Sequence, residues 1–117
     1  MPIDDVELLR QSAIVSQIVS ASFDGIADSY ILKVRVELQN GWLMDFWEHG
    51  IPNFRRYSFH VFQGDQMIVR WDNAPHHTHL STFPHHKHGE QGIKESEEMD
   101  LAKVLVELEK MVQVVQG

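Results

Sequence analysis

The alternation of apolar and polar residues within residues 30–38, which is strict from Leu32 onward, constrains the fold of this chain more than any other feature. The apolar residues recur at every second position: Leu32, Val34, Val36 and Leu38. Side chains on a β-strand point alternately to opposite faces, so this stretch is predicted to be a strand with one buried face. Asn40-Gly41 follows directly, and this dipeptide is the strongest short signal for a β-hairpin. The return strand is predicted over residues 42–48.

Further stretches extend this hairpin into a predicted meander. Residues 55–62 alternate as a strand, Gly64-Asp65 forms a turn, and residues 67–71 form the next strand. Another strand is predicted to end at Asp24-Gly25, although residues 14–23 also fit a helical period. No strand is predicted after Trp71.

Helices are predicted at both ends of the chain. A short amphipathic helix precedes the first strand, and Ser96 is the predicted N-cap of a final helix. The apolar stripe of that final helix follows a helical period: Leu101, Val104, Leu105, Leu108, Met111, Val112 and Val115. Such a stripe packs on a sheet. The predicted fold is therefore a single α+β domain over residues 1–117, with an antiparallel meander sheet of four to five strands packed against N- and C-terminal helices.

The composition narrows the function classes. The chain has 117 residues, no cysteine and a net charge of −7, which excludes disulfides and argues against bulk binding to nucleic acid. No apolar run reaches the length of a membrane span and no signal peptide is recognisable, so a cytoplasmic protein without a membrane partner is expected. Residues 49–94 nevertheless hold five basic and three acidic residues together with all eight histidines. This distribution indicates either a local anion-attracting face or ordinary solvated acidic helices elsewhere.

Six of the eight histidines lie between His76 and His88, in a stretch that contains the near-repeat PHHTH and PHHKH. One interpretation is a metal site, because imidazole is a common metal ligand. The spacing is unspecific, since adjacent histidines of an extended chain point in opposite directions and no HExxH motif is present. Asp72 could bind a metal or hold an imidazole from behind.

A second interpretation is acid–base catalysis without a metal. Histidine titrates near neutral pH, so two imidazoles can accept and donate the protons that cleavage of an RNA phosphodiester requires. A cation must then stabilise the extra charge on phosphorus, and an aromatic ring can stack a base. Beside Arg70, the candidates for binding the substrate are Arg55, Arg56, Lys87 and Trp71.

A third interpretation is structural. Asp72 and Asn73 are turn-forming residues at the end of a predicted strand. Histidine side chains can also satisfy the backbone hydrogen bonds of a long ordered loop. Three histidines are expected to lie outside any site: His49, His60 and His79.

Two unusual blocks, RWDNAPHH at residues 70–77 and TFPHHKH at residues 82–88, resemble the TumE family of toxins from bacterial and archaeal type II toxin–antitoxin pairs. The resemblance extends over residues 57–108. It implies a small toxin that a helix-turn-helix antitoxin, encoded beside it, neutralises, and it implies a ribonuclease-like action. This chain has Thr78-His79 where the family has a turn-forming proline and an acidic residue, so His79 is not carried over.

The resemblance leaves seven catalytic candidates: His76, His77, His85, His86, His88, Arg70 and Asp72. His77 and His86 are predicted to converge with Arg70, because Pro75 and Pro84 restrict two bends of the segment. The leading hypothesis is a metal-independent endoribonuclease toxin without a cofactor, whose partners are RNA and the antitoxin. Exposed strand edges are also compatible with a homodimer. The alternative is a non-enzymatic protein that inhibits or scaffolds a partner, with a structural or metal-binding histidine loop.

Overall fold

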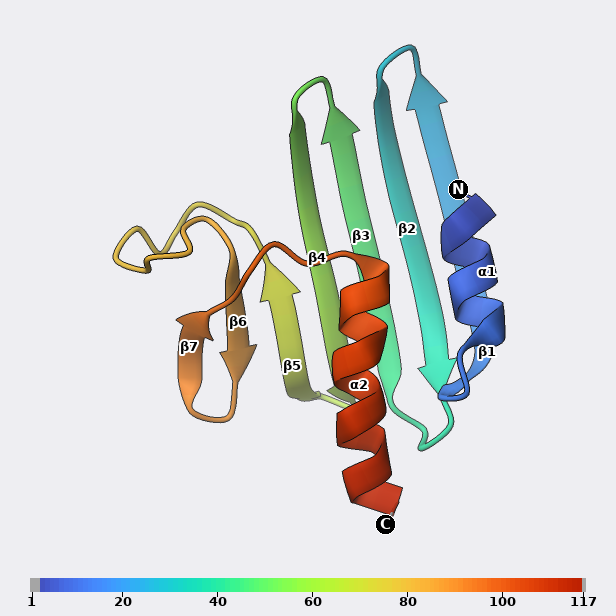
Figure 1. The fold of residues 1–117 in the computed structure, drawn as a ribbon. Coiled ribbons are helices and arrows are strands. Elements are labelled where there is room, and N and C mark those ends of the chain that lie inside the picture. The colour runs from blue at the N-terminus through green and yellow to red at the C-terminus, as the bar shows by residue number, and fades with distance from the viewer. Residues whose placement is uncertain (1–2, 117) are drawn as a thin grey trace.

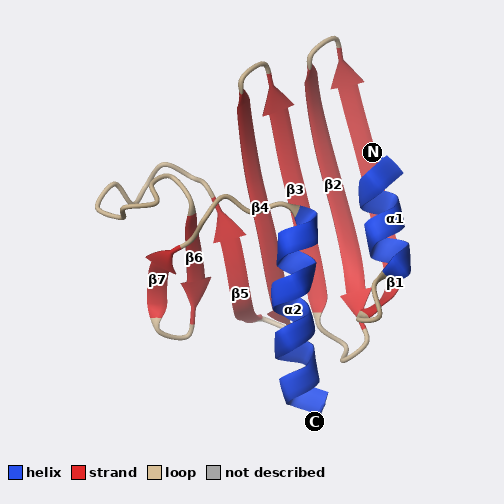
Figure 2. Ribbon diagram, viewed as in Figure 1, coloured by secondary structure: helices blue, strands red, loops and turns tan. Residues whose placement is uncertain are grey.

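The computed structural model describes the backbone of residues 3–116 and the side chains of residues 5–112. It contains one antiparallel sheet of seven strands, which follow one another in sequence order, and both helices lie on the same face of the sheet (Figure 1, Figure 2). The α+β fold with terminal helices is confirmed, but the prediction of four to five strands is too low. The elements are α1 (Ile3–Gln11), β1 (Val15–Ile26), β2 (Ser29–Leu38), β3 (Leu43–Ile51), β4 (Phe54–Gln63), β5 (Gln66–Asp72), β6 (His86–Gly89), β7 (Gly92–Glu95) and α2 (Leu101–Gln116).

The predicted hairpin at Asn40-Gly41 is confirmed between β2 and β3. Gly41 has a φ of 89°, a left-handed conformation that glycine adopts without steric cost. The Asn40 Oδ1 accepts a hydrogen bond of 3.2 Å from the Trp42 backbone N–H, and the Leu38 N–H donates one of 2.8 Å to the Trp42 carbonyl. The turn therefore sets the register of β3 against β2.

The face of the sheet beneath the helices holds the core. All four alternating apolar residues of β2 are buried there, and the rings of Phe46 and Phe59 stack with their centroids 4.6 Å apart. The apolar stripe of α2 covers these residues with the following buried side chains: Leu101, Val104, Leu105, Leu108 and Val112. Val115 of the predicted stripe lies outside the described side chains. Burying one large apolar side chain contributes about 1.5–3 kcal/mol, which explains why α2 docks on the sheet.

The N-cap of α2 differs from the prediction. Asp100, not Ser96, precedes the helix, and its Oδ1 accepts a hydrogen bond of 2.9 Å from the Lys103 backbone N–H. The Ser96 N–H instead donates to Thr82 Oγ1 at 3.1 Å. Ser96 therefore ties the end of β7 to residues 74–88, which we call the histidine segment.

Strands β6 and β7 were not expected from the sequence, because each has only four residues and neither alternates apolar with polar side chains. They form because β5 offers an unpaired edge. Arg70 lies opposite His88, and Asp72 lies opposite His86. The hairpin then turns at Gly92, whose φ is 97°. Part of the histidine segment is consequently a strand of the sheet rather than a loop.

The other face of the sheet, which we call the open face, is not covered by either described helix (Figure 1). Directly paired residues of antiparallel strands point to the same face, so the register defines two rows of side chains that cross the open face. The first row is Ser22, Lys33, Trp47, Ser58, Asp72 and His86. The second row is Ser20, Arg35, Asp45, His60, Arg70 and His88.

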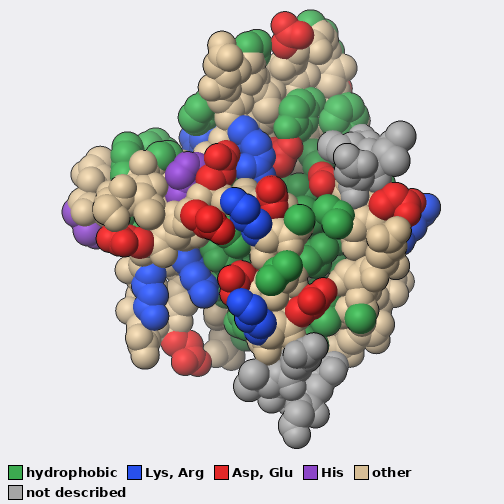
Figure 3. Space-filling view, viewed as in Figure 1, with side chains coloured by type: hydrophobic (Ala, Val, Ile, Leu, Met, Phe, Trp, Pro, Cys, Tyr) green, Lys and Arg blue, Asp and Glu red, His purple; other side chains and the backbone are tan. Residues whose placement is uncertain are grey.

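The negative charge of the chain belongs mostly to its helical segments. Residues 3–11 and 97–116 hold eight acidic and three basic residues, whereas residues 12–96 hold nine acidic residues, seven basic residues and all eight histidines. Figure 3 shows acidic side chains over α2, on the helix-covered face. Within the described part of the chain, neither helix is long and apolar enough to cross a membrane.

Candidate active site

The side chains of Asp72, the last residue of β5, and of Asn73, which follows it, hold the start of the histidine segment. Asp72 Oδ1 accepts a hydrogen bond of 3.0 Å from the Ala74 backbone N–H, which closes a turn. Asn73 is buried and pairs with β4 through its side chain. Its Oδ1 accepts from the Tyr57 N–H at 2.9 Å, and its Nδ2 donates to the Arg55 carbonyl at 2.7 Å. The predicted turn at Asp72 and Asn73 is confirmed.

A series of turns then returns the chain to the sheet edge. Backbone hydrogen bonds join residues two or three positions apart along residues 74–85, and the peptide bond between Phe83 and Pro84 is cis. Thr82 Oγ1 donates to the His85 carbonyl at 2.7 Å. The segment thereby enters β6 with His86 and His88 on the open face, opposite two residues of β5.

Three imidazole rings meet at this point. The ring centroids of His77 and His86 are 4.7 Å apart, those of His86 and His88 are 4.9 Å apart, and those of His77 and His88 are 5.9 Å apart. All three pairs are edge-to-face. We call these three residues, with Asp72 and Arg70, the histidine cluster.

Asp72 is the centre of the histidine cluster. Its side chain is only 3% exposed, yet it faces three groups that can carry positive charge. Arg70 Nε lies 2.9 Å from Oδ2, His86 Nε2 lies 2.9 Å from Oδ1, and His88 Nε2 lies 3.4 Å from Oδ2. A buried carboxylate needs such partners, because removing its charge from water is costly. The predicted convergence of His77, His86 and Arg70 therefore takes place around this carboxylate.

His86 is held on both sides of its ring. Its Nδ1 donates to the Pro84 carbonyl at 2.9 Å, and its Nε2 faces Asp72. A neutral imidazole has only one N–H, so a ring that donates through Nδ1 would turn the lone pair of Nε2 toward the carboxylate. The 2.9 Å between Nε2 and Oδ1 is a hydrogen-bond distance, which has room for a shared proton and for no larger cation. With its side chain only 1% exposed, His86 is a positioning residue.

His77 and His88 are the two imidazoles of the cluster that remain partly accessible. Loss of hydration and the neighbouring His86 ring lower the pKa of His77. Partial burial also lowers the pKa of His88, although the Asp72 charge opposes this effect. Both rings are therefore disposed to be neutral near pH 7, the form in which imidazole accepts a proton.

The same three histidines have the composition of a metal site. His77, His86 and His88 each offer one ring nitrogen, and the three nitrogens lie within 4.8 Å of one another. The Nδ1 bond of His86 is also of the kind that orients metal-binding histidines. Arg70, however, places a fixed positive charge on the same carboxylate, which disfavours a divalent ion there.

Two of the predicted catalytic histidines are not in the cluster. The His85 ring stacks on the buried ring of Tyr57, and its Nδ1 lies 2.8 Å from Tyr57 Oη, which in turn accepts a hydrogen bond from the Met99 N–H. Burial lowers the pKa of His85, in keeping with a neutral ring that accepts the tyrosine proton. His76 is exposed to solvent. Of each adjacent pair, one histidine faces the cluster and the other points elsewhere, as alternation predicts.

Three of the four predicted substrate-binding residues lie on the face that the helices cover, away from the histidine cluster. Trp71 is 2% exposed in the core and cannot stack a base. Lys87 lies opposite it in the register, with its Nζ 5.4 Å from the centroid of the Trp71 ring. Arg55 points toward the helices, where it bonds to Glu48 Oε1 at 2.8 Å and to the Met99 carbonyl at 2.9 Å. Arg56 alone lies on the open face, opposite His49.

His60, which was expected to be a bystander, is a direct neighbour of the cluster. It lies opposite Arg70 in the register. Burial is the main cause that lowers the pKa of His60, and the positive charge of Arg70 adds to this effect. The sequence contained a signal for this position, because His60 lies among the polar residues of the alternating β4 pattern. His79 contacts His77 edge-to-face, with the ring centroids 6.1 Å apart, but is itself exposed.

Comparison with known proteins places this arrangement in a family. The family model described as Toxin TumE matches residues 5–114. The chain belongs to the TumE toxin family. The match includes the whole histidine cluster and nearly all of the sheet and helices, so the cluster of this TumE-family chain lies within the family domain. Searches of curated proteins and of solved structures found no match.

Proposed function

We propose that this toxin is an endoribonuclease that cleaves RNA by metal-independent acid–base catalysis at the histidine cluster. The observation that carries the proposal is the meeting of two accessible imidazoles with an arginine around one buried carboxylate. Two proton-transfer groups and one fixed cation are what transesterification of RNA requires. The toxin role of the family agrees with a reaction that stops growth by destroying RNA.

His77 and His88 are the catalytic residues of the proposed reaction. The neutral ring takes the proton of the ribose 2′-OH, and the 2′ oxygen then forms a bond to phosphorus. The bond from phosphorus to the 5′ oxygen breaks, and that oxygen receives the proton taken from the 2′-OH, which the first ring donates directly or passes on through the second ring. The products are a 2′,3′-cyclic phosphate and a 5′-hydroxyl end, and no other reactant is consumed.

The other cluster residues support this pair. The Arg70 guanidinium stabilises the additional negative charge that develops on the phosphoryl oxygens. Its side chain is 42% exposed, so it can contact a phosphate while Nε faces Asp72. Asp72 and His86 are positioning residues, because both are buried and each fixes the orientation of the other.

The test is cleavage of single-stranded RNA by the purified protein, combined with growth of cells that express it. His88→Ala and Arg70→Ala are expected to reduce cleavage and relieve growth arrest, since an acid–base histidine contributes about a hundredfold to ten-thousandfold in rate. His76→Ala is the matched control, because this histidine is exposed outside the cluster. Intact RNA in arrested cells, with all three variants still toxic, would favour a toxin that acts only by binding.

A chelator separates the metal-free reaction from a metal-dependent one. We expect cleavage to survive dialysis against a chelator, and we expect the protein to remain folded. If the chelator abolishes cleavage, and stoichiometric zinc bound by the three cluster histidines restores it, the reaction is metal-activated hydrolysis and not metal-free acid–base catalysis.

The proposed partner of the toxin is a helix-turn-helix antitoxin encoded beside it, and the proposed compartment is the cytoplasm. The toxin role of the family supports such a pairing. Co-expression with the neighbouring reading frame is expected to restore growth. Growth arrest that persists beside every adjacent reading frame would contradict the pairing.

A further inference from the structure

The open face continues the histidine cluster across the sheet. The first and second rows end at His86 and His88 on β6 and begin at Ser22 and Ser20 on β1. From β2 to β6 there are four strand spacings of about 4.8 Å each, which gives a path of about 19 Å. This path is lined by polar, basic and aromatic side chains from every strand that it crosses.

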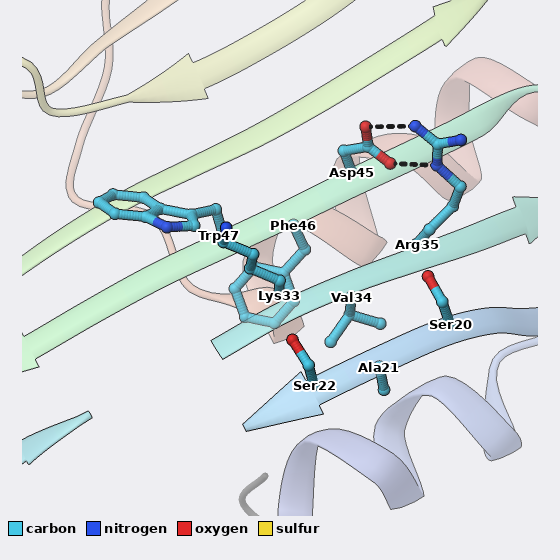
Figure 4. A pocket seen from close by; sticks show the side chains of 9 residues that line it. All are labelled: Ser20, Ala21, Ser22, Lys33, Val34, Arg35, Asp45, Phe46 and Trp47. Atoms are coloured by element: carbon cyan, nitrogen blue, oxygen red, sulfur yellow. Dashed lines mark hydrogen bonds and ion pairs between the residues drawn. The ribbon is translucent and has the colours of Figure 1, made fainter. Parts of the chain in front are cut away.

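A groove lies at the far end of this path. Its volume is about 450 Å³, and its lining includes Ser22, Lys33, Arg35 and Trp47 (Figure 4). Trp47 is half-buried and lies opposite the exposed Lys33 in the register. An indole and an ammonium side by side are suited to one nucleotide, because the ring stacks a base while the cation contacts a phosphate.

Aromatic side chains continue along β3 and along its neighbour β4. The Trp47 ring contacts that of His49, and the His60 ring lies 5.1 Å from that of Phe62 between centroids. The Arg35 guanidinium lies 5.5 Å from the Phe62 ring centroid. Rings of this kind on the exposed face of a sheet form a stacking platform in single-stranded RNA binders.

The charges along the two rows favour a polyanion. Their two carboxylates are already neutralised, since Asp45 makes two bonds of 2.7 Å and 2.9 Å to Arg35 and Asp72 is enclosed by the cluster. Lys33 is exposed and forms no ion pair with any residue whose side chain the structure describes, and Arg70 remains partly exposed. The negative charge of the chain belongs mostly to the helical segments, which cover the other face. The register also turns three further carboxylates, those of Asp24, Glu37 and Glu95, to the open face, but they lie outside the two rows. Within the rows the three basic residues outnumber the two acidic ones, which favours the phosphates of a nucleic acid along this path.

We infer that the open face binds single-stranded RNA, which runs across the strands from the Trp47 and Lys33 groove to the histidine cluster. The inference rests on the proposed function, because it names the path by which the substrate of that reaction reaches His77 and His88. In this arrangement, the Trp47 and Lys33 groove holds a nucleotide of the same RNA strand that lies away from the cleaved bond.

Binding can be measured separately from cleavage. A labelled single-stranded RNA of twelve nucleotides with 2′-O-methyl groups has no free 2′-OH, so it can bind without being cut. Stacking on an aromatic ring is worth about five- to a hundredfold in affinity, so Trp47→Ala is expected to weaken binding by that factor, while Trp47→Phe retains most of it. Lys33→Ala is expected to lower the slope of log affinity against log salt by about 0.7.

The matched controls lie on the helix-covered side. Phe23 pairs with Leu32 of the core face and is 49% exposed, and Lys103 is an exposed lysine of α2. Phe23→Ala and Lys103→Ala are expected to leave affinity and salt dependence unchanged. Equal losses in the control variants, or unchanged binding in both Trp47→Ala and Lys33→Ala, would overturn the inference.

Two outcomes separate this inference from the proposed function. Binding through Trp47 without cleavage of unmodified RNA would support the RNA path and refute the endoribonuclease. Cleavage with an unchanged KM in the Trp47 and Lys33 variants would support the endoribonuclease and overturn the path. Loss of antitoxin co-purification in Trp47→Ala, with RNA binding unaffected, would assign the open face to a protein partner and overturn it as well.

Discussion

Asp72→Asn provides a sensitive test of how the site is held together. The substitution preserves shape and keeps an oxygen that can accept the Ala74 N–H, but it removes the charge. The carboxylate is 3% exposed and faces Arg70, His86 and His88. Removing one partner of a buried ion pair costs about 3–5 kcal/mol, because the opposite charge is left uncompensated.

This cost corresponds to a large shift in melting temperature. The entropy of unfolding is about 2.1 cal/mol/K per residue, or about 0.25 kcal/mol/K for the 117 residues of this chain. A loss of about 3–5 kcal/mol therefore lowers the Tm by about 12–20 °C. Calorimetry or thermal denaturation followed by circular dichroism measures this directly, and urea unfolding gives an independent value of the free energy.

Asp45→Asn is a matched control on the same face. Asp45 also pairs with an arginine, at 2.7 Å from Arg35 Nε, but the two side chains are 41% and 46% exposed. Water already solvates both charges, so Asp45→Asn is expected to change the Tm little. The reasoning is refuted if Asp72→Asn and Asp45→Asn lower the Tm equally, because burial would then not decide the cost.

Three further predictions concern stability. Four histidines, His60, His77, His85 and His88, have lowered pKa values in the folded state, so as the pH falls the unfolded state binds protons before the folded state does. The free energy of unfolding should therefore be highest above about pH 6.5 and fall as the pH drops below it. Urea unfolding at several pH values measures this. Gly50→Ala should destabilise the fold by about 1–3 kcal/mol, because its Cβ would overlap the Tyr30 ring, and the double variant with Tyr30→Ala should lose less than the sum of the single losses. His85→Ala should cost about 1–3 kcal/mol by leaving the buried Tyr57 hydroxyl without its partner, yet the folded fraction should cleave RNA at the wild-type rate; a rate loss without destabilisation would contradict this.

Part of the candidate site follows from local sequence. Alternation in an extended chain already separates His76 from His77 and His85 from His86, and the structure shows one member of each pair in the cluster. The turn at Asp72 also follows from its residue type. The same alternation rule, applied to β4, would have placed His60 on the polar face beside the site.

Other parts of the site could not be read from the sequence. Trp71 and Lys87 look like a base-stacking ring and a phosphate-binding cation, but the pairing of β5 with β6 turns both toward the helices. Three polar residues and a glycine make up β6 and carry no periodic signal of their own, so this strand and its register depend on the free edge of β5. A shift of one residue in that register would exchange the residues of the two faces.

Local sequence alone determined the central strands, the hairpin at Asn40-Gly41 and the apolar stripe of the last helix. Each of these depends on interactions between residues close in the chain, where alternation, turn geometry and helical period act directly. Only the tertiary structure decided that His88 joins His77 and His86 in one cluster. His77 and His88 are brought together by a chain reversal and by strand pairing with Arg70 and Asp72, and these are long-range contacts that no local pattern encodes.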